Sequence, residues 1–178
     1  MYQIYIEEFF PYPVRDTFEA TTKEFDPLQK YIPNLTLLKT VETKMLDEGR
    51  KWWNLRFHGD SAIPAVARPI IKPSMLRWTQ HMVCDHNEMT IEWKIITDYF
   101  TEHIECSGMT YYHTEKDGTK IEIDGNFSIT LEKIPGIPSI IVRKAVAIVE
   151  PFIGRLITPN MKEFYSAIKK RIKEEKLV

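Results

Sequence analysis

The chain has 178 residues, of which 43% are hydrophobic and 28% are charged, and its formal net charge is −1. This length and composition are typical of one globular domain, residues 1–178, and exclude a disordered or fibrous chain. The near-neutral charge gives no general attraction to nucleic acid, so no such partner is expected.

Neither a leader peptide nor a membrane span is expected. The opening residues, MYQIYIEE, lack a basic start followed by an apolar stretch. No run reaches the ~18–20 apolar residues that a spanning helix needs. Cys84 and Cys106 are the two cysteines, too few for a disulfide framework, so a reducing, cytoplasmic location is expected.

Alternation of apolar and polar residues predicts β-strands through most of the first three quarters of the chain. The predicted strands are residues 2–10, 35–46, 50–58, 76–84, 89–97, 101–114 and 120–133. Short turn sequences join most of them, and Asp117-Gly118 is the strongest hairpin signal. The order predicts an antiparallel meander. After the first strand, apolar residues at Val14, Phe18 and Phe25 predict a helix of about three turns.

The last 40 or so residues predict one long helix with an apolar face. Its first half is predicted to present Ile141, Ala145, Ile148 and Phe152 on that face. Pro151 and Pro159 are expected to kink or split the helix, because each removes a helix hydrogen bond. Basic residues gather over 162–176. They fit either a solvated helix end or transient contact with an anionic membrane.

These elements predict an α+β fold: a curved antiparallel sheet of six to seven strands wrapped around the C-terminal helix. Such a sheet has one apolar face to bury, and one long helix is available to cover it. Strong twist curls the sheet around the helix and leaves a gap between them. A concave, mostly apolar gap with a few polar groups is typical of a small-molecule site.

The alternation of residues along each strand predicts which side chains line this gap. For each aromatic residue, ordinary core packing is the alternative. Residues 50–58 are apolar on both faces, so the inward face of this strand stays open. An inward Arg56 would bind a ligand carboxylate or phosphate, whereas the alternative is a solvated strand face. The predicted ligand-binding residues are Trp52, Arg56, Trp78, Gln80, Met82, Ile91, Trp93, Tyr111, Phe127, Ile141, Ala145, Ile148 and Phe152.

The order of elements resembles the helix-grip fold of the START-like superfamily, and within it PRELI-like lipid-transfer domains. The likeness runs over nearly the whole chain and is carried by order and pattern. The segments that carry it are residues 10–14, 33–34, 38–42, 47–50, 63–71 and 81–85. The resemblance implies an internal cavity for a lipid-like ligand and a lid beside its mouth.

Residues 59–73 occupy the position of that lid. They contain three prolines and an apolar cluster, which is unusual for a solvated loop. The predicted lid residues are Ile63, Val66, Ile70 and Ile71. The alternative is that they pack on the core as a short helix.

The sequence therefore favours non-catalytic binding or transfer of a small hydrophobic ligand such as a lipid, a quinone or a polycyclic molecule. The alternative is a cyclase- or hydrolase-type enzyme of the same fold, with His103, Glu105, Tyr111 or Arg56 in acid–base roles. A third reading is an interaction module with a closed interior. The spacing of His and Cys residues matches no metal motif, and neither a metal, a cofactor nor a catalytic residue is predicted.

Overall fold

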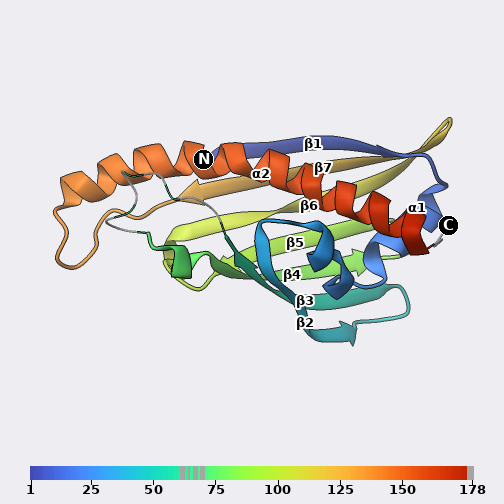
Figure 1. The fold of residues 1–178 in the computed structure, drawn as a ribbon. Helices are drawn as coiled ribbons and strands as arrows, with labels where there is room; N and C mark the ends of the chain where they lie inside the picture. The colour runs from blue at the N-terminus through green and yellow to red at the C-terminus, as the bar shows by residue number, and fades with distance from the viewer. Residues whose placement is uncertain (61–62, 64, 66–67, 69–70, 176–178) are drawn as a thin grey trace.

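The structure, a computed structural model, describes residues 1–60, 63, 65, 68 and 71–175, with only the backbone for 154–158. Its strands are β1 (Tyr2–Phe10), β2 (Leu35–Met45), β3 (Arg50–Gly59), β4 (Arg77–Asp85), β5 (Thr90–Thr97), β6 (Ile104–Glu115) and β7 (Gly118–Ile129). Its helices are α1 (Val14–Thr22), the 3-10 helices η1 (Asp26–Tyr31), η2 (Pro73–Met75) and η3 (Thr101–His103), and α2 (Ser139–Glu175). The strands form one seven-stranded sheet in the order β1-β7-β6-β5-β4-β3-β2 (Figure 1).

All neighbouring strands are antiparallel, as the short turns predict. The turn between β6 and β7 is tight, because Glu115 pairs directly with Gly118. A side chain at position 118 would lie 2.1 Å from the carbonyl oxygen of Phe10, so this position requires glycine. The first strand, β1, pairs with the last strand, β7. A helix that packs on these two strands therefore contacts the beginning and the end of the chain's strand-forming part.

Helix α2 is one uninterrupted helix of 37 residues. Pro151 and Pro159 lie inside it, so of the two predicted alternatives, a kink or a split, the split is wrong. The helix changes direction between its two halves in Figure 1. Each proline removes only one helix hydrogen bond, which bends a helix without ending it when neighbouring elements hold both halves. Within the described residues, no helix is both long and apolar enough to cross a bilayer.

Helix α2 packs against β1, η1 and β7, and η1 in turn contacts β2 at the opposite edge of the sheet. Arg171 of α2, which is only 2% exposed, links this helix to the segment between α1 and η1. Its guanidinium donates to the Glu24 carbonyl oxygen at 2.5 Å and pairs with the carboxylates of Glu24 and Glu175. Together, α1, η1 and the C-terminal half of α2 close one end of the concave face (Figure 1).

Replacing Arg171 with methionine is expected to lower the free energy of unfolding by about 2 kcal/mol. The cost comes from the unpaired Glu24 carbonyl, since the two carboxylates are partly exposed and regain water. Lys170→Met, at the exposed neighbouring position, is the control and should change stability by no more than ~0.5 kcal/mol. Equal effects of the two variants in urea denaturation would contradict this role for Arg171.

Candidate ligand-binding site

The inward face of β3 is the one that carries Trp53, Leu55 and Phe57. These side chains are 4%, 1% and 5% exposed, and Trp53 packs edge-on against Phe25, which precedes η1. Because neighbouring strand residues point to opposite faces, Trp52 must point outward. It lies there beside His81, with the Lys44 ammonium over its ring. The prediction that Trp52 lines the interior is wrong.

Arg56 also lies on the outer face, where it forms a two-pronged ion pair with Asp98. The hydrogen bonds from Arg56 hold the pKa of Asp98 below its usual value. The guanidinium is thus engaged by a protein carboxylate and does not reach the interior. The expected role of Arg56 as an interior anchor for a ligand head group is wrong, and the alternative of an outward-facing strand residue is correct.

Tyr111 is the third residue, after Trp52 and Arg56, that was predicted to line the interior but points outward. It stacks on His113 at a centroid distance of 6.1 Å, on the outer face of β6. Its neighbour Tyr112 is the inward residue, 5% exposed and packed against Phe18 of α1. An alternating strand cannot present both tyrosines to one face, so the prediction for Tyr111 is wrong.

A row of inward residues crosses the middle of the sheet. Trp53 pairs with Met82, Met82 with Trp93, Trp93 with Gly108, and Gly108 with Gly125. A Cβ added at Gly108 would lie 2.6 Å from the Trp93 ring, and one at Gly125 would lie 2.7 Å from it. The indole of Trp93 therefore lies directly against the two glycines and occupies the space that side chains at these positions would take.

The inner face is less covered at the end where α2 begins. Trp78 and Phe57 stack there, with ring centroids 5.2 Å apart and an interplanar angle of 6°. Trp78, Gln80 and Ile95 all point inward and are half-buried, whereas most of the remaining inner face is buried. Among the described residues, the Gln80 amide has no hydrogen-bond partner. This end combines apolar surface with one free polar group.

The other inward residues nominated from the strands are buried. Met82 and Ile91 are 6% and 4% exposed, and Phe127 lies next to Cys106 across β6 and β7. Burial raises the pKa of the Cys84 and Cys106 thiols to about 12, so both stay protonated at neutral pH. These residues form the floor of the interior.

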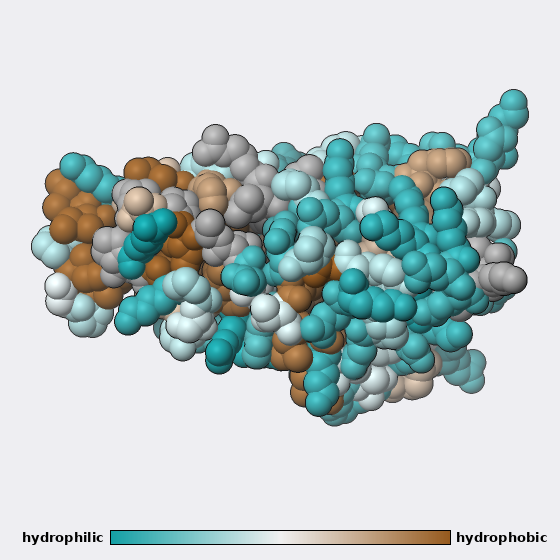
Figure 2. All heavy atoms as spheres, in the orientation of Figure 1, coloured by the Kyte–Doolittle hydropathy of each residue, from teal (hydrophilic) through white to brown (hydrophobic). Residues whose placement is uncertain are grey.

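The N-terminal half of α2 faces the sheet with a different set of residues from the one predicted. Val142, Ala145 and Val149 are buried at helical spacing, and Phe152 is half-buried. Ala145 and Phe152 thus lie on the inner side. Ile141 and Ile148 are 45% and 46% exposed, so their predicted interior position is wrong. Figure 2 shows apolar side chains gathered on the surface at this end of the molecule.

The described part of the segment over residues 59–73 packs on α2. Ile63 and Val149 form a small apolar cluster, against which Ile71, Ile129 and Ile153 pack. Arg68 donates a hydrogen bond to the Ile63 carbonyl oxygen at 3.1 Å. The predicted lid residues Val66 and Ile70 lie outside the described residues. Ile63 and Ile71 thus lie against the helix that borders the less covered end.

The opposite end of the interior holds a buried polar cluster. The Tyr112 and Thr21 hydroxyls are 2.9 Å apart, and Tyr165 of α2 hydrogen-bonds with Thr110. Burial raises the pKa of Tyr165 to about 12 and that of Tyr112 well above its usual value. Both phenols remain neutral, which suits cross-linking of α1, β6 and α2 and not proton transfer at neutral pH.

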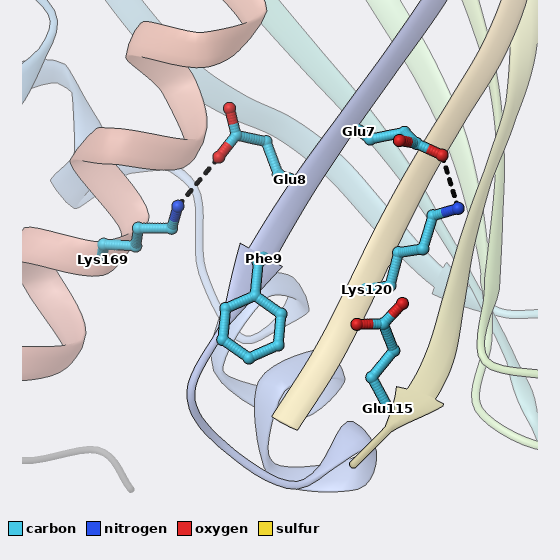
Figure 3. Close-up of a pocket in the computed structure, with 6 residues that line it drawn as sticks. All are labelled: Glu7, Glu8, Phe9, Glu115, Lys120 and Lys169. Atoms are coloured by element: carbon cyan, nitrogen blue, oxygen red, sulfur yellow. Dashed lines mark hydrogen bonds and ion pairs between the residues drawn. The ribbon is translucent and has the colours of Figure 1, made fainter. Parts of the chain in front are cut away.

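Two surface hollows lie outside this interior. One, of about 390 Å³, lies between β1, β7 and α2 and is lined by charged residues and Phe9 (Figure 3). Its Lys169 pairs with Glu8 at 2.8 Å, and its Lys120 pairs with Glu7. The other, of about 490 Å³, lies along β5 and β6 and includes Glu92, Lys94 and Glu105. The first hollow is lined mostly by charged side chains, whereas the lining of the second also includes Trp93, Cys106 and Met109.

Among the residues that the structure describes, no group of three or more His, Cys, Asp or Glu side chains is arranged to hold a metal ion.

No family model and no curated protein matches the chain. Solved structures do match. TTHA0849 from Thermus thermophilus is 15% identical, with 97% of this chain and 98% of that chain covered and a TM-score of 0.63. The Zhui aromatase/cyclase from Streptomyces sp. R1128 is 17% identical over 96% and 94%, with a TM-score of 0.57. Norcoclaurine synthase from Thalictrum flavum is 16% identical over 97% and 86%, with a TM-score of 0.55.

The chain has the helix-grip fold. Its seven-stranded antiparallel sheet and long C-terminal helix confirm the α+β architecture expected from the sequence. The helix-grip fold alone does not assign an activity, because the matched structures include named enzymes as well as TTHA0849, whose name states no function. Function has to be argued from the side chains of this chain.

Several interior residues of this helix-grip protein were not nominated from the sequence. Trp53, Leu55 and Phe57 were missed because β3 is apolar on both faces. Gly108 and Gly125 were missed, although two glycines in adjacent strands signal close approach of a large group. Their pairing depends on the register between β6 and β7, which the tight turn after Glu115 sets.

Proposed function

We propose that this protein binds a small, largely apolar molecule between the sheet and α2 and carries out no reaction on it. The observation that carries the proposal is the incomplete cover of the inner face at Trp78, Gln80 and Ile95. Stacked aromatic surface with one free amide suits a ligand that is mostly apolar and is oriented by a polar group. Covering apolar surface there gives about 25 cal/mol per Å².

The buried indoles favour a ligand that carries an oxygen acceptor. The Nε1 atoms of Trp53 and Trp93 are buried and, within the described part of the chain, have no hydrogen-bond partner. A buried donor without an acceptor costs about 1–3 kcal/mol. A carbonyl or hydroxyl oxygen that reaches either indole on binding would remove this cost. A quinone or polycyclic ketone therefore fits the interior better than a plain hydrocarbon chain.

Entry of the ligand is proposed to involve residues 59–73. Ile63 and Ile71 pack with Val149 and Ile153 of α2, beside the less covered end of the inner face. The described part of this contact is formed by apolar side chains. Such a gate would admit a ligand while the core at the other end stays intact.

An enzymatic role is less well supported by the positions of the polar residues. Glu105 and Tyr111 point to the outer face of β6, and Arg56 pairs with Asp98 outside the sheet. Acid–base catalysis needs such groups within hydrogen-bond reach of an enclosed substrate. Inside, the tyrosines and cysteines have raised pKa values and remain neutral. Binding without turnover is therefore the function proposed.

Native mass spectrometry of protein purified from its host tests this function. The expected result is a species heavier than the chain by the mass of one small molecule, which organic solvent removes. Thermal denaturation with a panel of quinones, polyketides and fatty acids provides the second readout, because a ligand that binds only the folded state raises the melting temperature. Absence of both a bound mass and any thermal shift would refute the proposal.

A further inference from the structure

The first half of α2 presents an unusually apolar face to solvent. Ile140, Ile141 and Ile148 are 59%, 45% and 46% exposed, and Ala147 between them is also exposed. Ile141 and Ile148 are seven residues apart, so they lie on one side of the helix. Figure 2 shows the apolar surface to which this part of α2 belongs at one end of the molecule. Exposed apolar surface concentrated in this way marks an interaction site.

Among the described residues of this face, the charged side chains are cations. Arg143 and Lys144 are exposed between the isoleucines. The nearest carboxylate of this helix half, Glu150, faces the sheet, where it accepts a hydrogen bond from the backbone N–H of Ile129 at 2.7 Å. Within the described residues 139–153, the exposed face therefore combines apolar side chains with positive charge and holds no carboxylate.

The basic C-terminal end of α2, which the sequence offered as a membrane contact, is less suited to that role. Arg171 is buried and bound to Glu24, and Lys169 pairs with Glu8. Glu174 and Glu175 add negative charge to the last turn. Part of the positive charge there is already neutralised, and the exposed apolar residues lie at the other end of the helix.

We propose that the face formed by Ile140, Ile141, Arg143, Lys144 and Ile148 docks on an anionic lipid surface. The isoleucines would enter the boundary between head groups and acyl chains, as the apolar face of an interfacial helix does. Arg143 and Lys144 would extend to the lipid phosphates, and each cation near such a surface contributes favourably. Docking goes beyond ligand binding and does not depend on it.

The charge pattern favours a membrane over a second copy of the chain. A two-fold dimer through this face would place the same patch against itself. Arg143 and Lys144 would then approach their own copies with no carboxylate on the described part of the face to pair with them. Like charges brought together in an interface oppose association, whereas an anionic lipid surface complements this face.

Co-sedimentation with vesicles of phosphatidylcholine and phosphatidylglycerol, with the anionic lipid as the minor component, tests the docking face. The wild-type protein is expected to bind these vesicles and to bind pure phosphatidylcholine vesicles weakly. Ile141→Ser together with Ile148→Ser should weaken binding roughly tenfold or more, because two half-exposed isoleucines no longer enter the lipid. Arg143→Gln with Lys144→Gln should reduce the preference for anionic vesicles, and added salt should weaken wild-type binding.

Val41→Ser with Met45→Ser is the matched control. These β2 residues are 60% and 62% exposed but lie outside the proposed face, so vesicle binding should be unchanged. Circular dichroism should show the same fold for every variant. The proposal is overturned if the wild-type protein does not bind anionic vesicles, or if both pairs of serine variants lose binding equally. It is also overturned if Ile141 and Ile148 are needed only for dimerisation, measured by analytical ultracentrifugation.

Discussion

Replacing Trp78 with alanine is expected to weaken ligand binding about tenfold, a loss of ~1.4 kcal/mol. Trp78 stacks on Phe57 at the less covered end of the inner face, where the ligand is proposed to bind. Removing the indole takes away apolar contact surface, and full burial of a large side chain is worth ~1.5–3 kcal/mol. Titration with the fluorescent probe 1-anilinonaphthalene-8-sulfonate measures the effect.

Trp52→Ala is the matched control for Trp78→Ala. Trp52 is also half-buried, lies on the neighbouring strand and contacts a histidine ring, but it faces the opposite side of the sheet. Its removal should leave the affinity for the probe unchanged. If Trp52→Ala weakened binding as much as Trp78→Ala, the ligand would not be on the inner face.

Gly108→Ala is expected to destabilise the protein by about 3 kcal/mol, at the upper end of the cost of overpacking a core. The added Cβ would lie 2.2 Å from the carbonyl oxygen of Asp124 and 2.6 Å from the Trp93 ring. The backbone of the central strands cannot move aside without breaking the ladder between β6 and β7. Urea denaturation should show a lower midpoint with an unchanged slope.

Gly49→Ala is the control for this substitution. Its added Cβ would also be close to another atom, at 2.0 Å, but that atom is the side-chain Nδ2 of Asn87. Asn87 is exposed and can rotate into solvent, so the expected loss of stability is much smaller. A similar loss for both variants would show that the cost at Gly108 does not come from the rigid packing of Trp93 and the strands.

The helix-grip architecture was predictable because strong local signals agree with one another. Alternation defined the strands, and the turn at Asp117-Gly118 fixed an antiparallel neighbour for β6. One long amphipathic helix then had one apolar sheet face to cover. The continuity of α2 through Pro151 and Pro159 was not predictable, because contacts with β1, β7 and η1 hold its two halves and no local signal describes them.

The candidate site was less predictable, for two physical reasons. In β3, large apolar side chains occupy both faces, so alternation could not tell the buried Trp53 from the outward Trp52. In α2, isoleucines occupy both the buried and the exposed sides. The predicted face at Ile141 and Ile148 is therefore offset by one residue from the buried face at Val142 and Val149. Apolar residues that contact a ligand or a membrane add to those of the core, so apolar positions in the sequence no longer mark the buried face alone.

The central claim is that the ligand binds on the inner face of the sheet, and the indole N–H signals of the four tryptophans test it most directly. In a ¹⁵N-labelled sample titrated with the molecule found by native mass spectrometry, the indole signals of Trp78 and Trp93 should shift, while that of Trp52 should stay in place. Single substitutions to phenylalanine assign the signals. A saturating ligand that moves only the Trp52 signal, or none of the four, would contradict the claim.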